Sequence, residues 1–195
     1  YKKQKILKDL SLTAYSGEVN CFIGKNGSGK TTLGKCISGL FRSQSGSILL
    51  NGEEMSYKEL SQKSLFIMQE AEFQFFTNSV LLELKYGANP SKYVEIEPLL
   101  KRFNMWEHRN RHPFSLSGGQ MQKLTLMMAY LSDKQVIVLD EPTSGMDRKS
   151  LDTIVELIKD MKKQKIVLVI SHDLEFIAAV SNKCLEIGDR FIQQI

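Results

Sequence analysis

The run Gly24–Thr31, Gly-Lys-Asn-Gly-Ser-Gly-Lys-Thr, constrains this chain more than any other feature. It matches the phosphate-loop pattern G-x-x-x-x-G-K-[ST] and follows the short apolar run Val19–Ile23. Glycines let backbone N–H groups curl around phosphate oxygens, and the start of a helix adds a favourable dipole. The pattern therefore predicts a strand, a phosphate-binding loop and a helix. In this loop Lys30 would reach the β- and γ-phosphates, and the Thr31 hydroxyl would bind Mg²⁺.

Two carboxylates follow a second apolar run. Val136–Leu139 is continuous and β-branched, as is typical of strands buried on both faces of a parallel sheet, and Asp140 and Glu141 come next. Ligands of open α/β sheets bind at the carboxyl ends of strands. We therefore expect Asp140 to hold Mg²⁺, directly or through water, and Glu141 to take a proton from an attacking water. The alternative is that both acids only follow a strand in a turn.

The run Leu116–Gln120, Leu-Ser-Gly-Gly-Gln, precedes a helix with the apolar stripe Leu124, Met127, Met128 and Leu131. Ser117 suits an N-cap, but each of the two glycines early in a helix costs roughly 1 kcal/mol relative to alanine. A cap alone therefore explains the run poorly, whereas exposed N–H groups suit a second anion contact. Two anion sites in one compact chain suggest either two ligands or one ligand shared between two chains.

The remaining pattern predicts an α/β fold with a mostly parallel sheet. Ile166–Ile170 is a further buried strand, reached from Val136–Leu139 through a helix that implies a right-handed crossover. A helical stripe follows the phosphate loop, at Leu33, Cys36, Ile37, Leu40 and Phe41. Ile48–Leu50 and the following Asn51-Gly52 indicate a strand and a turn.

Between about Glu70 and Ser115 the strand signals fade. Apolar residues at Val80–Leu84 and again from Leu99 to Trp106 indicate helices. Three prolines are expected to interrupt this segment, Pro90, Pro98 and Pro113. We interpret it as a helical insertion in the α/β core.

Composition and charge exclude several classes of protein. Of the 195 residues 42% are apolar, enough for a packed core without disulfides. The net charge of +4 is spread along the chain, so no nucleic-acid partner is expected. The three cysteines are widely separated and lack C-x-x-C spacing, which favours a reducing compartment and disfavours a metal site. No apolar run approaches the roughly 18 residues of a membrane span, and no signal-peptide core is present. The missing initiator Met suggests a fragment of a longer protein.

Taken in order, Gly24–Thr31, Leu116–Gln120 and Val136–Glu141 resemble the nucleotide-binding subunit of ATP-binding cassette (ABC) proteins. Gln69 stands at the Gln-loop of that family. Further matches are Ser144–Asp147 at the D-loop, where Ser-Ala-Leu-Asp is more usual, and His172 at the switch histidine. Taken alone, His172 would be a packed or surface histidine, and Asp147 an N-cap. Lys123 stands where Arg is common in the family.

The resemblance implies a P-loop NTPase with an ABC-type core, an N-terminal antiparallel β part and a helical insertion. It implies one ABC ATPase domain over residues 1–195, with a core at 1–69 and 125–195 and a helical subdomain at about 70–124. ATP and Mg²⁺ are the implied ligands. Two subunits, identical or different, would pack head to tail, so that Leu116–Gln120 of one chain closes over the γ-phosphate held by the other.

The site residues implied by the resemblance fall into three groups. Glu141, His172 and Lys30 would be catalytic, and Thr31, Gln69 and Asp140 would hold the metal. The nucleotide would be bound by Tyr1, Asn26, Gly27, Ser28, Gly29, Lys30, Thr31, Thr32, Gln69, Ser117, Gly118, Gly119, Gln120 and Asp147. Tyr1 stands upstream of the phosphate loop, where the family often has an aromatic residue that stacks on adenine; the alternative is a frayed terminus.

Two classes of ABC protein compete. One is the ATP-hydrolysing subunit of a transporter, peripheral on the cytoplasmic face of the cell membrane, with integral membrane subunits as partners. The other is a non-transport ATPase of DNA repair or translation, or a fragment of a tandem-cassette protein. The interval from Lys30 to Ser117 is too short for the coiled-coil arm of a chromosome ATPase, and a single cassette disfavours a translation factor.

The stretch Gln69–Phe76 bears on the type of transporter. It resembles the Gln-Asn-Pro-x-x-Gln-Leu-Phe stretch of energy-coupling factor (ECF) importers, which take up vitamins, cobalt or nickel. Gln69, Gln74 and Phe76 match, whereas the Asn and Pro are absent. Exposed Phe75 and Phe76 would suit a surface that couples to membrane subunits; the alternative is that both are core aromatics.

Overall fold

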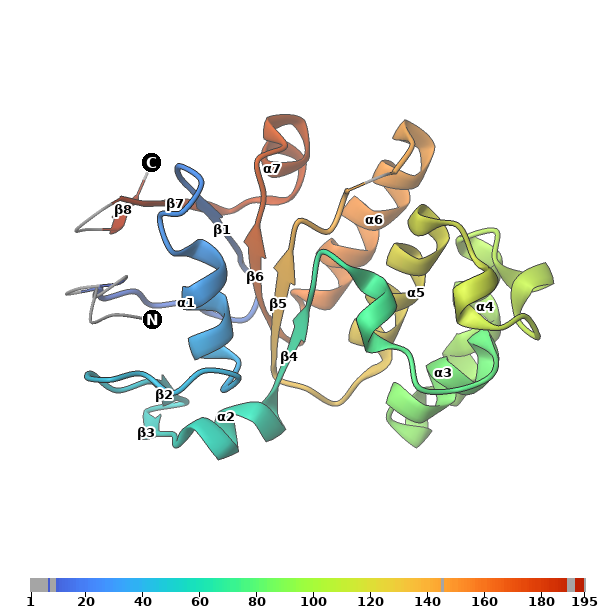
Figure 1. Cartoon of the computed structure of the whole chain (residues 1–195), viewed down its shortest axis with the longest axis horizontal. Coiled ribbons are helices and arrows are strands. Elements are labelled where there is room, and N and C mark those ends of the chain that lie inside the picture. The colour runs from blue at the N-terminus through green and yellow to red at the C-terminus, as the bar shows by residue number, and fades with distance from the viewer. Residues whose placement is uncertain (1–6, 8–9, 145, 189–191, 195) are drawn as a thin grey trace.

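The computed structural model describes residues 7, 10–144, 146–188 and 192–194. A six-stranded sheet forms its centre, in the order β4-β5-β6-β1-β7-β8 (Figure 1). Neighbouring strands are parallel from β4 to β7, and β8 pairs antiparallel with β7. The strands are β1 Val19–Ile23, β4 Ser64–Ile67, β5 Val136–Asp140, β6 Ile166–Ile170, β7 Lys183–Ile187 and β8 Ile192–Gln194. The mostly parallel sheet is as predicted.

Helices cover both faces of the sheet (Figure 1). Ile137 and Leu139 of β5 pack in one apolar cluster with residues of α5 Gly118–Leu131 and α6 Arg148–Met161. Val136 and Val138 point the other way and pack with Leu33 of α1 Lys30–Ile37. Both faces of β5 are therefore buried, which explains its unbroken apolar sequence.

The parallel strands all end at one edge of the sheet. Ile23 ends β1 where the phosphate loop starts, and Asp140 at the end of β5 pairs with Ile170 at the end of β6. Ile67 ends β4, paired with Leu139. Residues that are far apart in the sequence therefore meet at this edge, which is where open α/β sheets bind ligands.

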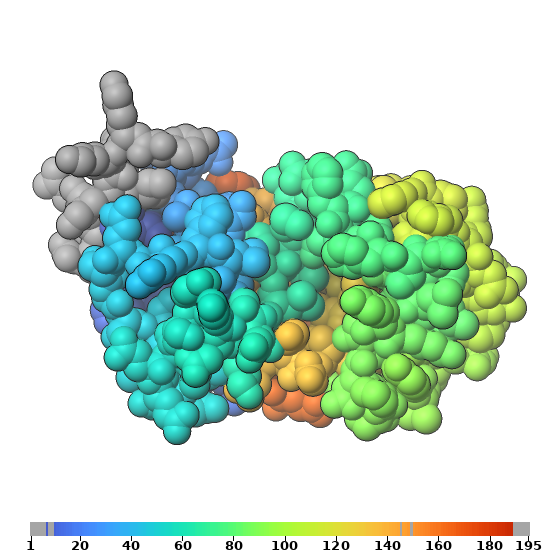
Figure 2. Space-filling model, turned by 60° about the horizontal axis from the view of Figure 1, so that its bottom comes forward, coloured from blue at the N-terminus to red at the C-terminus, as the bar shows by residue number. Residues whose placement is uncertain are grey.

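A helical segment forms one end of the molecule (Figures 1 and 2). Between residues 68 and 135 the structure has no strand. This segment contains η1 Ala71–Gln74, α3 Val80–Gly87, η2 Pro90–Lys92, α4 Tyr93–Arg102, η3 Trp106–His108, η4 Pro113–Ser115 and α5. The predicted insertion is thus helical. The proposed subdomain division stays a prediction, and α5 runs without a break through its boundary at residues 124 and 125.

Smaller elements complete the fold. The predicted turn Asn51-Gly52 joins β2 Leu49–Leu50 to β3 Glu53–Glu54 in an antiparallel pair, and both turn residues have positive φ. The remaining helices are α2 Tyr57–Lys63 and α7 Leu174–Val180. In the described part of the chain, no helix is long and apolar enough to cross a membrane.

Two local predictions were wrong. The stripe that included Leu40 and Phe41 is too long, because α1 ends at Ile37 and both side chains are at least half exposed. Gly39 turns the chain there with φ of +71°, in a place where a Cβ would lie 2.2 Å from Tyr57 O.

Pro98 does not interrupt the helical segment, because it lies inside α4. A proline there removes the N–H that would bond the carbonyl of Val94. Val94 is 80% exposed, so water can take that place. Pro90 and Pro113 do stand at the starts of η2 and η4.

Candidate active site

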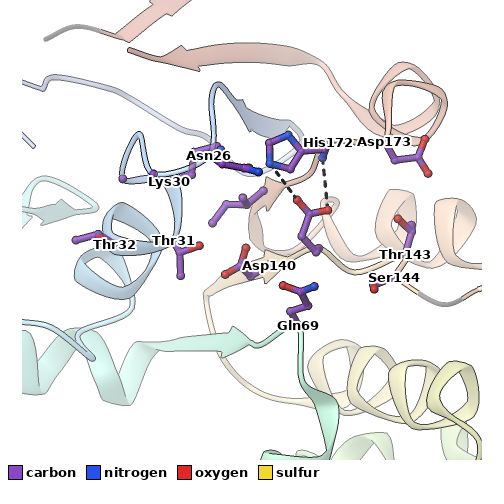
Figure 3. Close-up of a pocket in the computed structure, with 14 residues that line it drawn as sticks. Asn26, Lys30, Thr31, Thr32, Gln69, Asp140, Thr143, Ser144, His172 and Asp173 are labelled. Atoms are coloured by element: carbon purple, nitrogen blue, oxygen red, sulfur yellow. Dashed lines mark hydrogen bonds and ion pairs between the residues drawn. The ribbon is translucent and has the colours of Figure 1, made fainter. Parts of the chain in front are cut away.

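A cleft of about 700 Å³ opens at the carboxyl edge of the sheet (Figure 3). Its walls come from the phosphate loop and from the ends of β4, β5 and β6. The lining residues are Asn26, Gly27, Gly29, Lys30, Thr31, Thr32, Gln69, Asp140, Glu141, Thr143, Ser144, Ile170, His172 and Asp173. Most of the predicted nucleotide and metal residues are thus brought together.

The phosphate loop has the backbone that anion binding requires. Gly24, Gly27 and Gly29 all have positive φ, and a Cβ on Gly24 would lie 2.5 Å from Ile187 O. Gly29 is the N-cap of α1 and makes no side-chain cap, so the first N–H groups of this helix receive no side-chain acceptor. Ser28 Oγ is buried without a hydrogen-bond partner. The loop therefore offers unused donors, which fits a bound phosphate.

Lys30 lies within this loop. Its Nζ donates to Gly24 O at 2.8 Å and to Lys25 O at 2.9 Å, so the ammonium group is held among the loop carbonyls. Burial lowers the pKa of Lys30, while Glu141 and Asp140 act in the opposite direction. A phosphate would supply the negative charge that this buried ammonium group lacks within hydrogen-bond distance.

Oxygen donors of three elements converge beside the loop. Asp140 at the end of β5 is buried and lines the cleft beside the Thr31 side chain at the start of α1. Gln69, beyond the end of β4, points into the same space (Figure 3). Burial raises the pKa of Asp140, which Thr31, Lys35 and Lys30 partly offset. Hydroxyl, amide and carboxylate oxygens fit Mg²⁺, and a cation would favour the ionised form of this buried acid.

Glu141 has a strained backbone and a fixed carboxylate. Its φ is +50°, and its N–H donates to Ile170 O at 2.9 Å. Ser171 Oγ and the backbone N–H of His172 donate to Glu141 Oε2 at 3.3 and 3.4 Å. His172 Nε2 lies 3.7 Å from Glu141 Oε1 (Figure 3). The carboxylate is therefore oriented over the cleft by residues that follow β6, where a proton acceptor could serve.

The run Ser117–Gln120 lies outside this cleft. Ser117 is the N-cap of α5 and forms a capping box with Gln120, as its N-cap interpretation predicts. A Cβ on Gly118 would meet open space, so steric packing does not require a glycine there. Asp147 likewise caps α6, accepting from Ser150 N at 2.8 Å, and lines a second, smaller pocket.

Three residues line the cleft without having been expected there, and one expected residue is not described by the structure. Tyr1 lies outside the described residues. Thr143, Ser144 and Asp173 line the cleft although sequence reasoning did not assign them to it. Thr143 and Ser144 follow the acids at the end of β5 after Pro142, and Asp173 follows His172. Nearness in sequence to a strand end was the signal available for all three.

Aromatic side chains gather near Gln69 on the helical segment. Phe73, Phe76 and Phe114 are exposed, and Phe76 is 77% exposed. Phe75 is only 8% exposed and its ring lies 6.2 Å from that of Phe114, so of the two alternatives for this residue the core aromatic is correct. Phe76, Phe73 and Phe114 are instead exposed, and we refer to these three residues as the aromatic surface.

Comparisons with known proteins agree on the kind of protein. A sequence profile described as ABC transporter matches residues 7–144. An ABC transporter ATP-binding protein of Treponema denticola is 35% identical over 97% of this chain and 39% of its own length. A Bacillus subtilis protein named for HMP/thiamine import, YkoD, is 34% identical over 96% of this chain and 35% of its own length. A Pyrococcus horikoshii ABC transporter ATP-binding protein, PH0132, is 31% identical, over 94% of this chain and 74% of its own length.

Solved structures give the same result. The chain superposes with a TM-score of 0.80 on cbiO1 of Clostridium perfringens, described as part of the ABC transporter complex cbiONQ. That match has 25% identity and covers 97% of this chain and 81% of the other. An ATP-binding subunit of an ABC transporter matches with a TM-score of 0.88 at 23% identity, covering 100% of this chain and 85% of the other, and so shares the fold. The chain spans only 35–40% of the length of the first curated relatives it matches.

Proposed function

Because this chain belongs to the ABC transporter family, we propose that it is the ATP-hydrolysing part of a transporter, and that the transporter is an ECF-type importer. The observation that carries the ATPase proposal is the meeting of Lys30, Asp140 and Glu141 at one sheet edge. One cleft therefore contains a group that could bind phosphate, a group that could bind a metal ion and a group that could accept a proton. Hydrolysis of ATP to ADP and phosphate uses all three.

Each residue has a proposed task. The loop N–H groups and Lys30 bind the β- and γ-phosphates, and Lys30 then exchanges its bonds to Gly24 O and Lys25 O for phosphate oxygens. Glu141 accepts the proton of the attacking water, and His172 orients that carboxylate toward the γ-phosphate. Thr31, Gln69 and Asp140 would hold Mg²⁺, which when bound offsets the negative charge of the phosphates.

We propose that Ser117–Gln120 serves the nucleotide of another chain. These residues lie outside the cleft of their own chain, yet their helix start is exposed and includes Gly118 where packing requires no glycine. A head-to-tail pair of cassettes, identical or different, gives them a ligand. Asp147, at the start of α6, would lie at the same interface.

The membrane partner would dock on the aromatic surface. Its exposed phenylalanines lie close in sequence to Gln69 and to Ser117, so a partner seated there could respond to the cleft and to the start of α5. The chain would then be a peripheral component at the cytoplasmic face of the cell membrane. Its other partners are then integral membrane subunits.

Three observations support the ECF type. Gln69, Gln74 and Phe76 match the stretch typical of those importers. One relative is named for HMP/thiamine import, and a structural neighbour belongs to the cbiONQ complex. A vitamin or a metal ion is therefore the proposed cargo. The second candidate is one cassette of a longer protein, favoured by relatives more than twice the length of this chain.

A pull-down from native cells tests the proposal. The bait is the Glu141→Gln variant with Mg-ATP, recovered after mild detergent extraction and read by mass spectrometry. The matched control is Lys30→Ala in the same Glu141→Gln background, which should not bind ATP. We expect integral membrane proteins and a second cassette with the first bait, and loss of the second cassette with the control. Recovery of ribosomes or DNA-bound proteins instead would exclude transport and leave an ATPase.

A further inference from the structure

His108 contacts the start of α5 from outside the cleft. It ends the short helix η3 and is half-buried. Its ring Nε2 lies 3.0 Å from Gln120 Nε2, and its Nδ1 lies 3.3 Å from Arg111 Nη1. The imidazole therefore sits between a side-chain amide and a guanidinium group.

The capping box fixes which group donates. Gln120 Oε1 accepts from Ser117 N–H at 3.0 Å, so the amide oxygen of Gln120 is already used. The other end of that amide is an NH₂ group, which can only donate. Arg111 Nη1, which faces Nδ1, is also only a donor, and a neutral imidazole has one acceptor nitrogen, so only one of the two contacts can be a hydrogen bond. The contact with Gln120 is shorter, at 3.0 Å against 3.3 Å, and is half-buried, whereas the contact with Arg111 is exposed to water. We therefore assign the acceptor to Nε2 and the hydrogen to Nδ1, and Arg111 Nη1 then bonds water instead. This assignment makes His108 the acceptor that holds the Gln120 side chain in its capping orientation.

The turn that carries His108 is itself anchored. The carbonyls of Arg111 and Arg109 accept from Val80 N and Leu81 N at 3.0 and 2.9 Å, which joins this turn to the first turn of α3. Arg109 packs its guanidinium 4.3 Å from the centre of the Trp106 ring and donates to Trp106 O at 2.9 Å. His108 therefore presents its acceptor from a braced position, not from a free loop.

We propose that His108 is a positioning residue for the helix start Ser117–Gln120. It acts through Gln120, whose side chain closes the capping box on Ser117 and so fixes the first N–H groups of α5. This inference rests on the proposed function, in which that helix start binds the ATP of another chain. A misplaced helix start would weaken closure of the pair without changing how a single chain binds ATP in its own cleft.

Three variants of the full chain distinguish positioning of the helix start from a general contribution of His108 to folding. His108→Leu removes the acceptor, and His108→Gln restores an acceptor oxygen at a similar reach. Asn110→Ala is the matched control, because Asn110 is exposed on the same turn. Hydrogen exchange without nucleotide is measured at the amides of residues 118–121. We expect about fivefold faster exchange in His108→Leu, because one hydrogen bond is lost. The other two variants should exchange at rates near wild type.

A long-range ¹H–¹⁵N NMR spectrum of the wild-type imidazole reads the tautomer directly. We expect the hydrogen of His108 on Nδ1. A hydrogen on Nε2 would overturn the inference, because Nε2 could not then accept from Gln120. Unchanged exchange at residues 118–121 in His108→Leu would overturn it equally.

The functional measurement uses the Glu141→Gln background. The Mg-ATP concentration for half-maximal association with a second cassette should rise about fivefold in His108→Leu and recover in His108→Gln. Affinity of the single chain for a fluorescent ATP analogue should stay unchanged. Faster exchange with unaltered association would overturn the positioning role while the ATPase proposal stands. Absence of ATP-driven association in the Glu141→Gln parent would defeat the proposed function itself, and this inference with it.

Discussion

Glu141 combines a backbone that non-glycine residues rarely adopt with a carboxylate fixed by Ser171 and His172. Glu141→Gln keeps the shape of the side chain but removes its basicity. We expect ATP turnover to fall by about 10²–10⁴-fold, the usual contribution of general-base catalysis, while ATP still binds. Phosphate release in steady state and equilibrium binding of ATP measure the two quantities. The control Glu107→Gln, on the exposed side of η3, should keep wild-type turnover; turnover at the wild-type rate in Glu141→Gln would exclude Glu141 as the base.

The structure brings many of the expected site residues to one cleft for a physical reason. Asp140 ends a buried strand, Lys30 and His172 follow buried strands, and parallel strands bring their carboxyl ends to one edge. Exposure was harder to predict. Phe75 and Phe76 are neighbours of the same type, yet one is buried against Phe114 and the other is exposed. That difference depends on the contact of Phe75, directly after η1, with Phe114 of η4, which no local pattern encodes.

At the scale of elements, Glu83 of α3 holds the loop that joins η1 to α3. Its side chain is fully buried, and it accepts from Phe76 N, Thr77 N and Thr77 Oγ1 at 3.1, 2.8 and 2.7 Å. Glu83→Ala leaves Phe76 N and Thr77 N without an acceptor, whereas Thr77 Oγ1 can still donate to Ser79 O at 3.1 Å, so we expect a loss of roughly 3 kcal/mol in the free energy of unfolding. Urea unfolding measures it. Glu83→Gln retains an acceptor oxygen and should lose less; an equal loss in both would mean that the charge, not the acceptor, matters.

Lys165 joins the end of α5 to the start of β6. Its buried Nζ donates to Ser132 O and Lys134 O at 2.6 and 3.0 Å. Burial, aided by Lys92, lowers the pKa of Lys165 from 10.5 to about 8. Between these two pH values the unfolded chain binds the proton and the folded chain does not, so stability rises with pH.

Comparison with Lys165→Met isolates this contribution. From pH 8 to pH 10 the wild type should gain about 2 kcal/mol in total over the variant in the free energy of unfolding, with a slope that approaches about 1.4 kcal/mol per pH unit near pH 9. The offset between the two proteins at pH 7 does not affect this slope. Parallel stability curves above pH 8 would show that the folded chain keeps this proton.

The types of the elements were largely predictable, and their ends were not. Strand β5 and helix α6 followed from apolar runs and periodicity that their burial explains. Helix α1 is shorter than its stripe because Gly39 packs against the backbone of Tyr57, a contact between distant segments. Pro98 is tolerated in α4 because Val94 faces water. Solved neighbours confirm the predicted fold class over the whole chain.

At the scale of the whole molecule, the aromatic surface should carry the membrane partner. Phe76→Ser removes a ring that is 77% exposed, so the folded chain should lose little stability. We expect weaker recovery of integral membrane proteins in the pull-down, with ATP binding unchanged. The matched control is Tyr15→Ser. Tyr15 is an exposed aromatic residue that precedes β1, at the end of the sheet where the parallel strands begin. An equal loss of membrane-protein recovery with both variants would show that the aromatic surface is not the specific docking site of the membrane partner.

Lys30 and Ser117 lie in different parts of one chain, and only Lys30 lines the cleft. In a head-to-tail pair of identical chains, each composite site would take Lys30 from one copy and Ser117 from the other. Lys30→Ala and Ser117→Arg would each inactivate both sites when present in both copies. A mixed pair would keep one site with both residues intact. Two alleles that fail separately would therefore complement each other when expressed together, whereas an allele with both substitutions would complement neither.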